Sequence, residues 1–207
     1  LYRTNSQSRA IEDALMREGV GYRIIGGVRF YERREIKDAL AYLRLLINPH
    51  DDVSFRRVVN VPARGVGKSV MDALDGVDPG TLHADTPLLA VGLAAAPSPR
   101  SLWTRLLAAI DGRQLQPRAL AALKTFRDLI AGLTREAPGA SVSIALGLML
   151  DRTGYLRNLR DDRSEESEAR IENLMELVSA AREYETREAD ASLGGFGGFF
   201  DLKAAGY

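Results

Sequence analysis

The chain has 207 residues, and its 28 Lys and Arg residues balance 28 Asp and Glu residues, so the formal net charge is zero. Hydrophobic residues make up 45% of the chain and charged residues 27%, which is ordinary for a globular protein and excludes disorder over the whole length. Cysteine is absent and histidine occurs twice, which excludes disulfide scaffolds, cysteine-ligated zinc, iron–sulfur clusters and histidine-rich metal sites.

The start of the chain predicts two helices with a β-type stretch between them. Apolar residues spaced by three and four predict helices at residues 6–18 and 33–47. Residues 22–30 hold a β-type run, a glycine pair and a short alternating pattern, which together predict a β element. Residues 1–5 are expected to form a second β piece.

The rest of the chain predicts further helices and two segments that are not helical. Residues 75–100 are rich in Asp, Gly, Pro and Ser, so we expect a loop with at most a short helix at residues 88–93. The tail, residues 191–207, is rich in glycine and specifies no clear structure. The fold class is therefore mainly α, with a short β element near the N-terminus. Predicted helices cover residues 51–59, 68 onward, 102–110, 117–134, 142–151 and 165–187.

Residues 60–69 (NVPARGVGKS) form the most informative motif, and two chemical interpretations compete for it. The first is a nucleotide phosphate loop, G-x-x-x-x-G-K-[ST], because Gly67, Lys68 and Ser69 match its end. The first glycine of that motif, however, falls on Pro62, which lacks an N–H group and fixes φ.

The second interpretation is a helix–hairpin–helix-like turn that holds a phosphate of duplex DNA. Its glycines let a ligand approach the backbone, and the first N–H groups of the following helix point at the anion. Such contacts hold the nucleic-acid backbone without reading sequence. An ordinary helix connection with solvated cations remains the alternative. The candidate duplex-binding residues are Arg64, Gly65, Val66, Gly67, Lys68 and Ser69.

The uneven distribution of charge supports an anionic partner for the first part of the chain. Residues 1–70 carry 13 Lys and Arg and 8 Asp and Glu, a net charge of +5, so the remainder has a net charge of −5. Residues 2–9 are polar and basic at a predicted strand-to-helix junction, which suits a phosphate, although a plain helix cap explains them too. The mixed charges of residues 32–38 predict a solvated, salt-bridged face.

Five segments of the chain resemble the UvrD/PcrA/Rep helicases of superfamily 1. The resemblance covers about residues 1–190 and implies the edge of the RecA-like 2A subdomain at residues 1–9 and a helical 2B subdomain at residues 10–190. Residues 191–207 depart from the family pattern. The matching segments are residues 1–9 (LYRTNSQSR), 22–33 (YRIIGGVRFYER), 35–44 (EIKDALAYLR), 60–67 (NVPARGVG) and 170–177 (RIENLMEL).

The resemblance implies a regulatory 2B subdomain of an ATP-dependent 3′–5′ DNA helicase that serves DNA repair. It places residues 64–69 against duplex phosphates, and Arg3 and Asn5 near the single strand. The family's nucleotide loop and its acidic D-E-x-Q-D box are missing, so ATP and Mg would bind in the parent helicase and this chain would hold no cofactor and no catalytic residue.

The implied partners are duplex DNA at a single-strand junction and the 2A and 1B subdomains, with mismatch-repair proteins or RNA polymerase as further partners. A protein-interaction module without DNA binding of its own is the rival function. No apolar run reaches the roughly 20 residues that cross a bilayer, and the first residues show no signal-peptide pattern. We therefore expect a cytoplasmic piece of a longer protein, with no membrane partner.

We expect the 207-residue chain to hydrolyse no ATP, with or without DNA, because Pro62 interrupts the phosphate loop. A phosphate-release assay with single-stranded and duplex DNA checks this. DNA-stimulated turnover that Lys68→Ala abolishes would show instead that residues 62–69 form a nucleotide loop.

Overall fold

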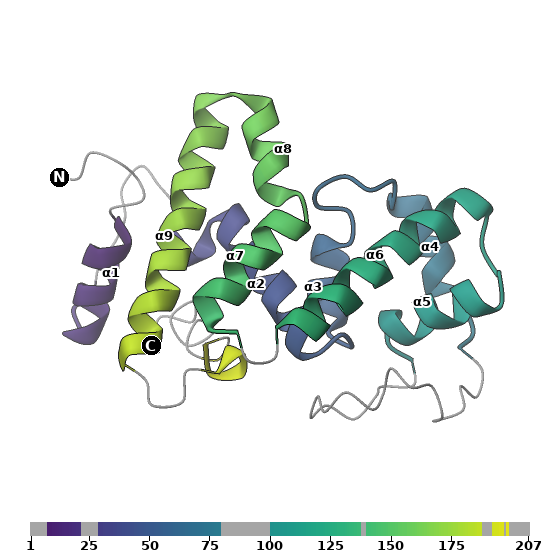
Figure 1. The fold of residues 1–207 in the computed structure, drawn as a ribbon, viewed down its shortest axis with the longest axis horizontal. Helices are drawn as coiled ribbons and strands as arrows, with labels where there is room; N and C mark the ends of the chain where they lie inside the picture. Colours follow the sequence, from purple (N-terminus) through teal and green to yellow (C-terminus); the bar gives the residue numbers. More distant parts are fainter. Residues whose placement is uncertain are drawn as a thin grey trace. The chain divides into compact units, whose positions relative to one another are not determined.

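The computed structural model describes residues 8–21, 29–79, 100–137, 140–187, 192–196 and 198, and Figure 1 shows that most of them lie in helices. None of these residues lies in a strand, so the mainly α prediction is confirmed. The elements are α1 (Ser8–Arg17), the 3₁₀ turn η2 (Phe30–Glu32), α2 (Arg34–Ile47), α3 (Asp52–Val58), α4 (Lys68–Asp75), α5 (Leu102–Asp111), α6 (Pro117–Glu136), α7 (Val142–Arg152), α8 (Tyr155–Asp162) and α9 (Glu165–Arg187).

The chain divides into two compact units. The first combines Leu1–Leu43 with Gly139–Tyr207, and the second is Arg44–Pro138. The first unit therefore contains α1, η2, most of α2 and α7 to α9, whereas the second contains the end of α2 and α3 to α6. The division expected from the sequence, at residues 9 and 190, stays a prediction. Among the described residues, no helix is both long enough and apolar enough to span a membrane.

In the first unit, α7 and α8 follow one another alongside α9, and all three helices bury apolar residues (Figure 1). α9 supplies Leu174 and Leu177, which have no exposed surface, at the helical spacing that the sequence shows. Helix α1 is fastened to α9 by a buried arginine, because Arg9 forms ion pairs with Glu176 (2.6 Å) and Glu183 (2.9 Å).

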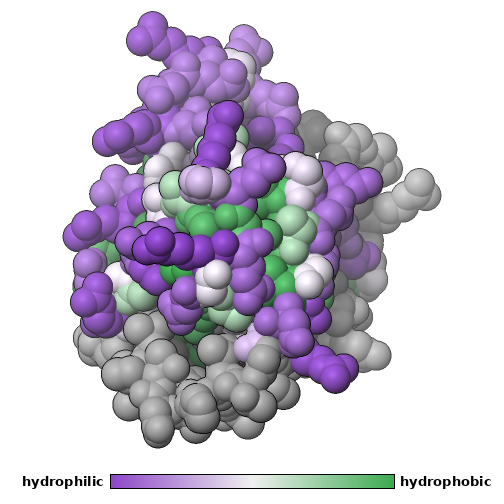
Figure 2. All heavy atoms as spheres, turned by 90° about the vertical axis from the view of Figure 1, so that its right-hand side faces the viewer, coloured by the Kyte–Doolittle hydropathy of each residue, from purple (hydrophilic) through white to green (hydrophobic). Residues whose placement is uncertain are grey.

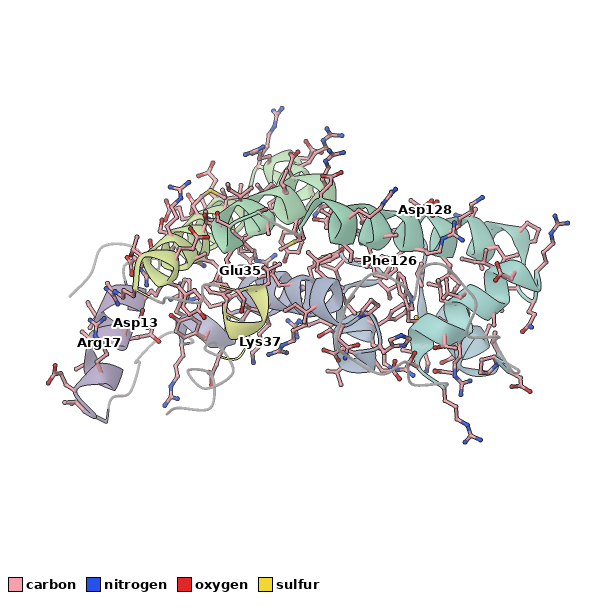
Figure 3. All side chains as sticks on the ribbon, turned by 60° about the horizontal axis from the view of Figure 1, so that its bottom comes forward. Asp13, Arg17, Glu35, Lys37, Phe126 and Asp128 are labelled. Atoms are coloured by element: carbon pink, nitrogen blue, oxygen red, sulfur yellow. The ribbon has the colours of Figure 1, made fainter. Side chains whose placement is uncertain are left out.

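The charge run at residues 32–38 was expected to face solvent, and this expectation is wrong for two of its carboxylates. Glu35 is 5% exposed and Asp38 is 2% exposed. Each has a hydrogen-bond donor: the Asn173 amide donates to Glu35 (2.6 Å) and the Tyr155 hydroxyl donates to Asp38 (2.8 Å). A buried carboxylate needs such partners, and Figure 3 shows Glu35 among neighbouring side chains while Lys37 points away.

The second unit has a core of aromatic and aliphatic side chains from α3, α5 and α6. Phe55 of α3 and Phe126 of α6 meet edge to face, with ring centroids 5.4 Å apart, and both are fully buried. In Figure 3, Phe126 points toward the other helices, whereas Asp128 on the same helix points away from them. Figure 2 shows one face of the molecule, on which hydrophilic residues surround a smaller apolar centre.

The predicted β element at residues 22–30 is wrong at Phe30, and most of its other residues lie outside the described part of the chain. Residues 1–7 and 22–28 lie outside the described part of the chain. At Phe30, where the alternating pattern predicted continued β structure, the chain makes the 3₁₀ turn η2 instead. Phe30 and Tyr31 are both buried there. The predicted short helix at residues 88–93 also lies outside the described residues.

Helix α8 was not predicted from the sequence. Its eight residues, YLRNLRDD, are mostly polar, and only Tyr155, Leu156 and Leu159 are buried. Left-handed residues bound it on both sides, namely Gly154 (φ 75°) and Arg163 (φ 51°). Tyr155, Leu156 and Leu159 fall at helical spacing, but a segment of eight residues is too short to be stable as a helix by itself, and packing against α7 and α9 stabilises it.

A helix–hairpin–helix arrangement is not supported. Compact helix–turn–helix motifs join their two helices by a turn of three or four residues. Here residues 59–67 separate α3 from α4, and both helices pack on α5. The turn expected at residues 62–67 and the new helix at Lys68 are nevertheless present.

The buried Tyr155 gives the first unit an expected sensitivity to alkali. Burial raises the pKa of its hydroxyl, and the nearby Asp38 carboxylate raises that pKa further. An unfolded tyrosine ionises near pH 10, so the stability contributed by the neutral hydroxyl is complete below about pH 10 and falls as the pH rises above it.

Urea unfolding between pH 8 and pH 11 measures this effect. Tyr155→Phe should lower the free energy of unfolding at pH 8 by roughly 1–3 kcal/mol, because Asp38 loses a donor. The variant should also lose less stability than the wild type above about pH 10. Equal losses in both proteins would contradict the assignment.

Candidate nucleic-acid interface

The predicted site lies on the turn between α3 and α4, in the second unit. The turn is closed by Asn60, whose side-chain oxygen accepts hydrogen bonds from the N–H groups of Arg64 (2.8 Å) and Val66 (3.1 Å). A short polar side chain that binds nearby backbone groups is a common way to fix a turn. Two N–H groups that would otherwise need water are therefore satisfied within the turn.

Arg64 is turned back onto the protein. Its Nη1 donates to the carbonyl oxygens of Val58 (3.3 Å) and Pro62 (3.1 Å). Its Cζ lies 5.9 Å from the centroid of the Phe126 ring, within the range of a cation–π contact. Arg64 therefore links the turn to the end of α3 and to α6 while keeping its positive charge close to the site.

The two glycines of the motif differ in their conformation. Gly65 has φ +79°, a left-handed value that side chains rarely adopt. Gly67 is the N-cap of α4 with φ −83° and ψ −174°, which any residue adopts. A Cβ built on Gly67 would meet nothing within 4 Å. Between them, Val66 is 2% exposed and anchors the turn in the core.

Lys68 and Ser69 are exposed and form the first residues of α4. The first N–H groups of a helix have no acceptor inside it, and Gly67 brings no side chain to cap them. The helix dipole adds partial positive charge at this end, and the Lys68 ammonium adds a full charge. The start of α4 therefore offers N–H donors and a cation at the molecular surface.

The opposite end of α4 is held by two arginines. Arg56 of α3 forms an ion pair with Asp75 (2.6 Å), and this hydrogen bonding raises the pKa of Arg56. Arg105 of α5 donates to the carbonyl oxygens of Asp75 and Val77. Cations near the C-terminal end of a helix interact favourably with its dipole. Because its last turn is fixed to α3 and α5, the N-terminus of α4 is held in position.

A histidine–serine pair elsewhere in the second unit has a structural explanation. His50 Nδ1 lies 2.6 Å from Ser101 Oγ, and burial lowers the pKa of His50. Ser101 is 2% exposed, and its Oγ accepts the N–H of Thr104 as the cap of α5. The pair therefore stabilises the start of a helix. Within the described ranges, no group of three acidic or histidine side chains could hold a metal ion.

The structure brings the duplex-binding candidates together, and it adds one residue of the motif that the sequence analysis did not place among the site residues. Arg64 to Ser69 follow one another around the turn, with Arg64 half-buried and Val66 buried. The single-strand candidates Arg3 and Asn5 lie outside the described residues. This residue is Asn60. Its position directly after a predicted helix and before a glycine turn was a signal for it, because asparagine commonly binds backbone groups in turns.

The sequence of the chain is similar to that of DNA helicases. Residues 1–82, which include the turn, match the family described as the UvrD-like helicase C-terminal domain. The chain is 38% identical over 196 residues to the ATP-dependent DNA helicase PcrA of Bacillus subtilis, a match that covers 95% of this chain and 24% of PcrA.

Two further relatives give the same result. DNA helicase II of Escherichia coli is 37% identical over 193 residues, covering 93% of this chain and 24% of that protein. The ATP-dependent DNA helicase UvrD1 of Mycobacterium tuberculosis is 39% identical over 196 residues, covering 93% of this chain and 23% of UvrD1. The chain thus spans about a quarter of the length of the curated relatives it matches.

Substitutions of the two glycines should change stability in opposite directions. Gly65→Ala should lower the free energy of unfolding by roughly 1–2 kcal/mol, because a side chain is strained at φ +79°. Gly67→Ser should raise it by about a few tenths of a kcal/mol, because serine can cap α4.

Urea unfolding of each variant measures both effects, with Gly132→Ala in α6 as the control. A Cβ on Gly132 also meets nothing within 4 Å, and alanine should be favourable inside a helix. A loss of stability in Gly67→Ser comparable to that in Gly65→Ala would contradict the described geometry of the cap.

Proposed function

We propose that this chain, which is homologous to a segment of the UvrD and PcrA helicases, is the duplex-contacting, regulatory 2B subdomain of an ATP-dependent 3′–5′ DNA helicase. The homology supports a fragment of a DNA helicase. The 2B role and the contact with duplex DNA are the proposal, and they rest on the chemistry of the turn between α3 and α4.

The observation that carries the proposal is the glycine at the N-cap of α4. Serine, threonine, aspartate or asparagine at an N-cap satisfies one of the first N–H groups of a helix with its side chain and stabilises the helix by about a few tenths of a kcal/mol relative to glycine. At Gly67 neither the backbone angle nor the available space requires glycine. A residue without a side chain leaves the first N–H groups of α4 accessible, and a phosphate oxygen is a ligand that they suit.

The other residues of the turn take separate roles in this proposal. The N–H groups of Lys68 and Ser69 donate to a phosphate oxygen, and the Lys68 ammonium adds long-range attraction. Gly65 shapes the turn, and Val66 anchors it in the core. Arg64 contributes its charge from a half-buried position against Phe126. Such a contact holds a duplex backbone and reads no base sequence.

In the intact helicase, a duplex held by this turn would bias the orientation of the subdomain. If 2B exists in two orientations relative to 2A, DNA that binds one orientation better shifts the population toward it. ATP and Mg would bind in the parent protein, and Arg3 and Asn5 would contribute near the single strand. Mismatch-repair proteins or RNA polymerase are further proposed partners, and DNA repair is the proposed process.

The test is the salt dependence of binding to a labelled DNA hairpin, followed by fluorescence anisotropy. The wild-type chain should bind weakly, with a slope that reflects about two or three released counterions, because one turn touches few phosphates. Lys68→Ala should reduce that slope by roughly one. Gly67→Ser should weaken binding about tenfold with little change in slope, because it blocks approach and removes no cation.

Gly132→Ser is the matched control, since it adds the same side chain to α6 away from the turn. It should bind as the wild type does. A folded chain without salt-dependent affinity for the hairpin would overturn the proposal and favour a protein-interaction module. Equal affinity of the wild type and Gly67→Ser would leave the turn as a structural connector.

A further inference from the structure

Asn60 is the polar side chain on which the conformation of the turn depends. Its Oδ1 accepts the N–H of Arg64 on one side of Gly65 and the N–H of Val66 on the other. Gly65 is the left-handed residue of the turn, so Asn60 holds the backbone on both sides of the point where the chain reverses its direction. Asn60 itself directly follows Val59, the C-cap of α3, and is thereby placed by that helix.

Two side chains hold the turn, one as a hydrogen-bond acceptor and the other as a donor. Asn60 accepts hydrogen bonds from two N–H groups, whereas the Arg64 guanidinium donates to the carbonyl oxygens of Val58 and Pro62. Val66 then enters the core, where it is 2% exposed. The next residue, Gly67, begins α4. The position of the first α4 amides is therefore fixed through Val66, whose backbone Asn60 holds and whose side chain the core holds.

From these contacts we infer that Asn60 is the positioning residue of the phosphate-contacting turn. This inference rests on the proposed function of residues 64–69. Asn60 sets the orientation of the α4 N-terminus before DNA arrives and makes no contact with the phosphate itself. Binding to a pre-formed turn avoids the loss of conformational entropy that ordering a loose turn would require.

Three substitutions separate positioning from a direct contact. Asn60→Leu keeps the approximate size of the side chain and removes the acceptor. Asn60→Asp keeps an acceptor oxygen in the same shape, removes the side-chain N–H donors and adds a negative charge. Asn158→Leu is the control, because Asn158 is an exposed asparagine on α8 in the first unit.

The experiment measures the affinity of the 207-residue chain for the DNA hairpin across a salt series. Asn60→Leu should bind about tenfold more weakly at every salt concentration, with an unchanged salt slope, because two hydrogen bonds but no cation are lost. Asn60→Asp should bind weakly at low salt and approach the wild-type affinity at high salt, where its repulsion of phosphate is screened. Asn158→Leu should match the wild type throughout.

Amide hydrogen exchange gives a second readout that does not depend on DNA. The Val66 amide should exchange faster in Asn60→Leu than in the wild type and should regain protection in Asn60→Asp. Far-UV circular dichroism establishes that each variant is folded at the temperature of the binding measurement.

The outcomes separate this inference from the function on which it rests. A wild-type chain that binds no DNA overturns the proposed function and the inference with it. A wild-type chain that binds, together with a folded Asn60→Leu of equal affinity, overturns the inference alone. Asn60→Asp that stays as weak as Asn60→Leu at high salt, with Val66 protected, shows that the Asn60 amide contacts DNA directly and also overturns it.

Discussion

The first N–H groups of an α-helix find no acceptor within the helix, so they need a side chain, water or a ligand as their hydrogen-bond partner. Asp51 caps α3 and Ser101 caps α5, each with its own side chain. Glu185 reaches across from α9 to accept the N–H of Ser143 in the first turn of α7. α6 begins with Pro117, which has no N–H group. α8 also follows a glycine, Gly154, but there Thr153 Oγ1 accepts the N–H of Tyr155, the first residue of the helix. At α4 the cap is Gly67 and no side chain caps the helix, so its first donors face the surface beside Lys68, where the DNA contact is proposed.

The surrounding contacts explain why such an exposed helix end can be held in one place. Arg56 and Arg105 bind Asp75, the last residue of α4, to α3 and α5. Asn60 and the buried Val66 fix the connection that leads into its first turn. Binding to donors that are already in position costs less conformational entropy than binding that must first order those donors. Rigidity at both ends of α4 therefore supports a weak, sequence-independent contact made by only a few groups.

Helix positions were predictable from the sequence, whereas the partners of polar side chains were not. Regular apolar spacing located α2 and α9, because a helix that buries one face must repeat that pattern. α8 carries the pattern over eight residues only, which is too short to predict a helix without its packing against α7 and α9. Glu35 and Asp38 looked like surface charges, and only the fold shows that Asn173 and Tyr155 donate to them. In the candidate site, the glycines and Lys68 were visible in the sequence, but the direction in which Arg64 points was not.

The contact itself can be observed most directly at the amides of α4. In a ¹⁵N-labelled sample titrated with a short DNA hairpin, the amide resonances of Gly67, Lys68 and Ser69 should shift in a salt-dependent manner, while those of α8 in the first unit should stay in place. Shifts confined to other surfaces, or none at these three amides while the hairpin binds, would contradict a phosphate held at the start of α4.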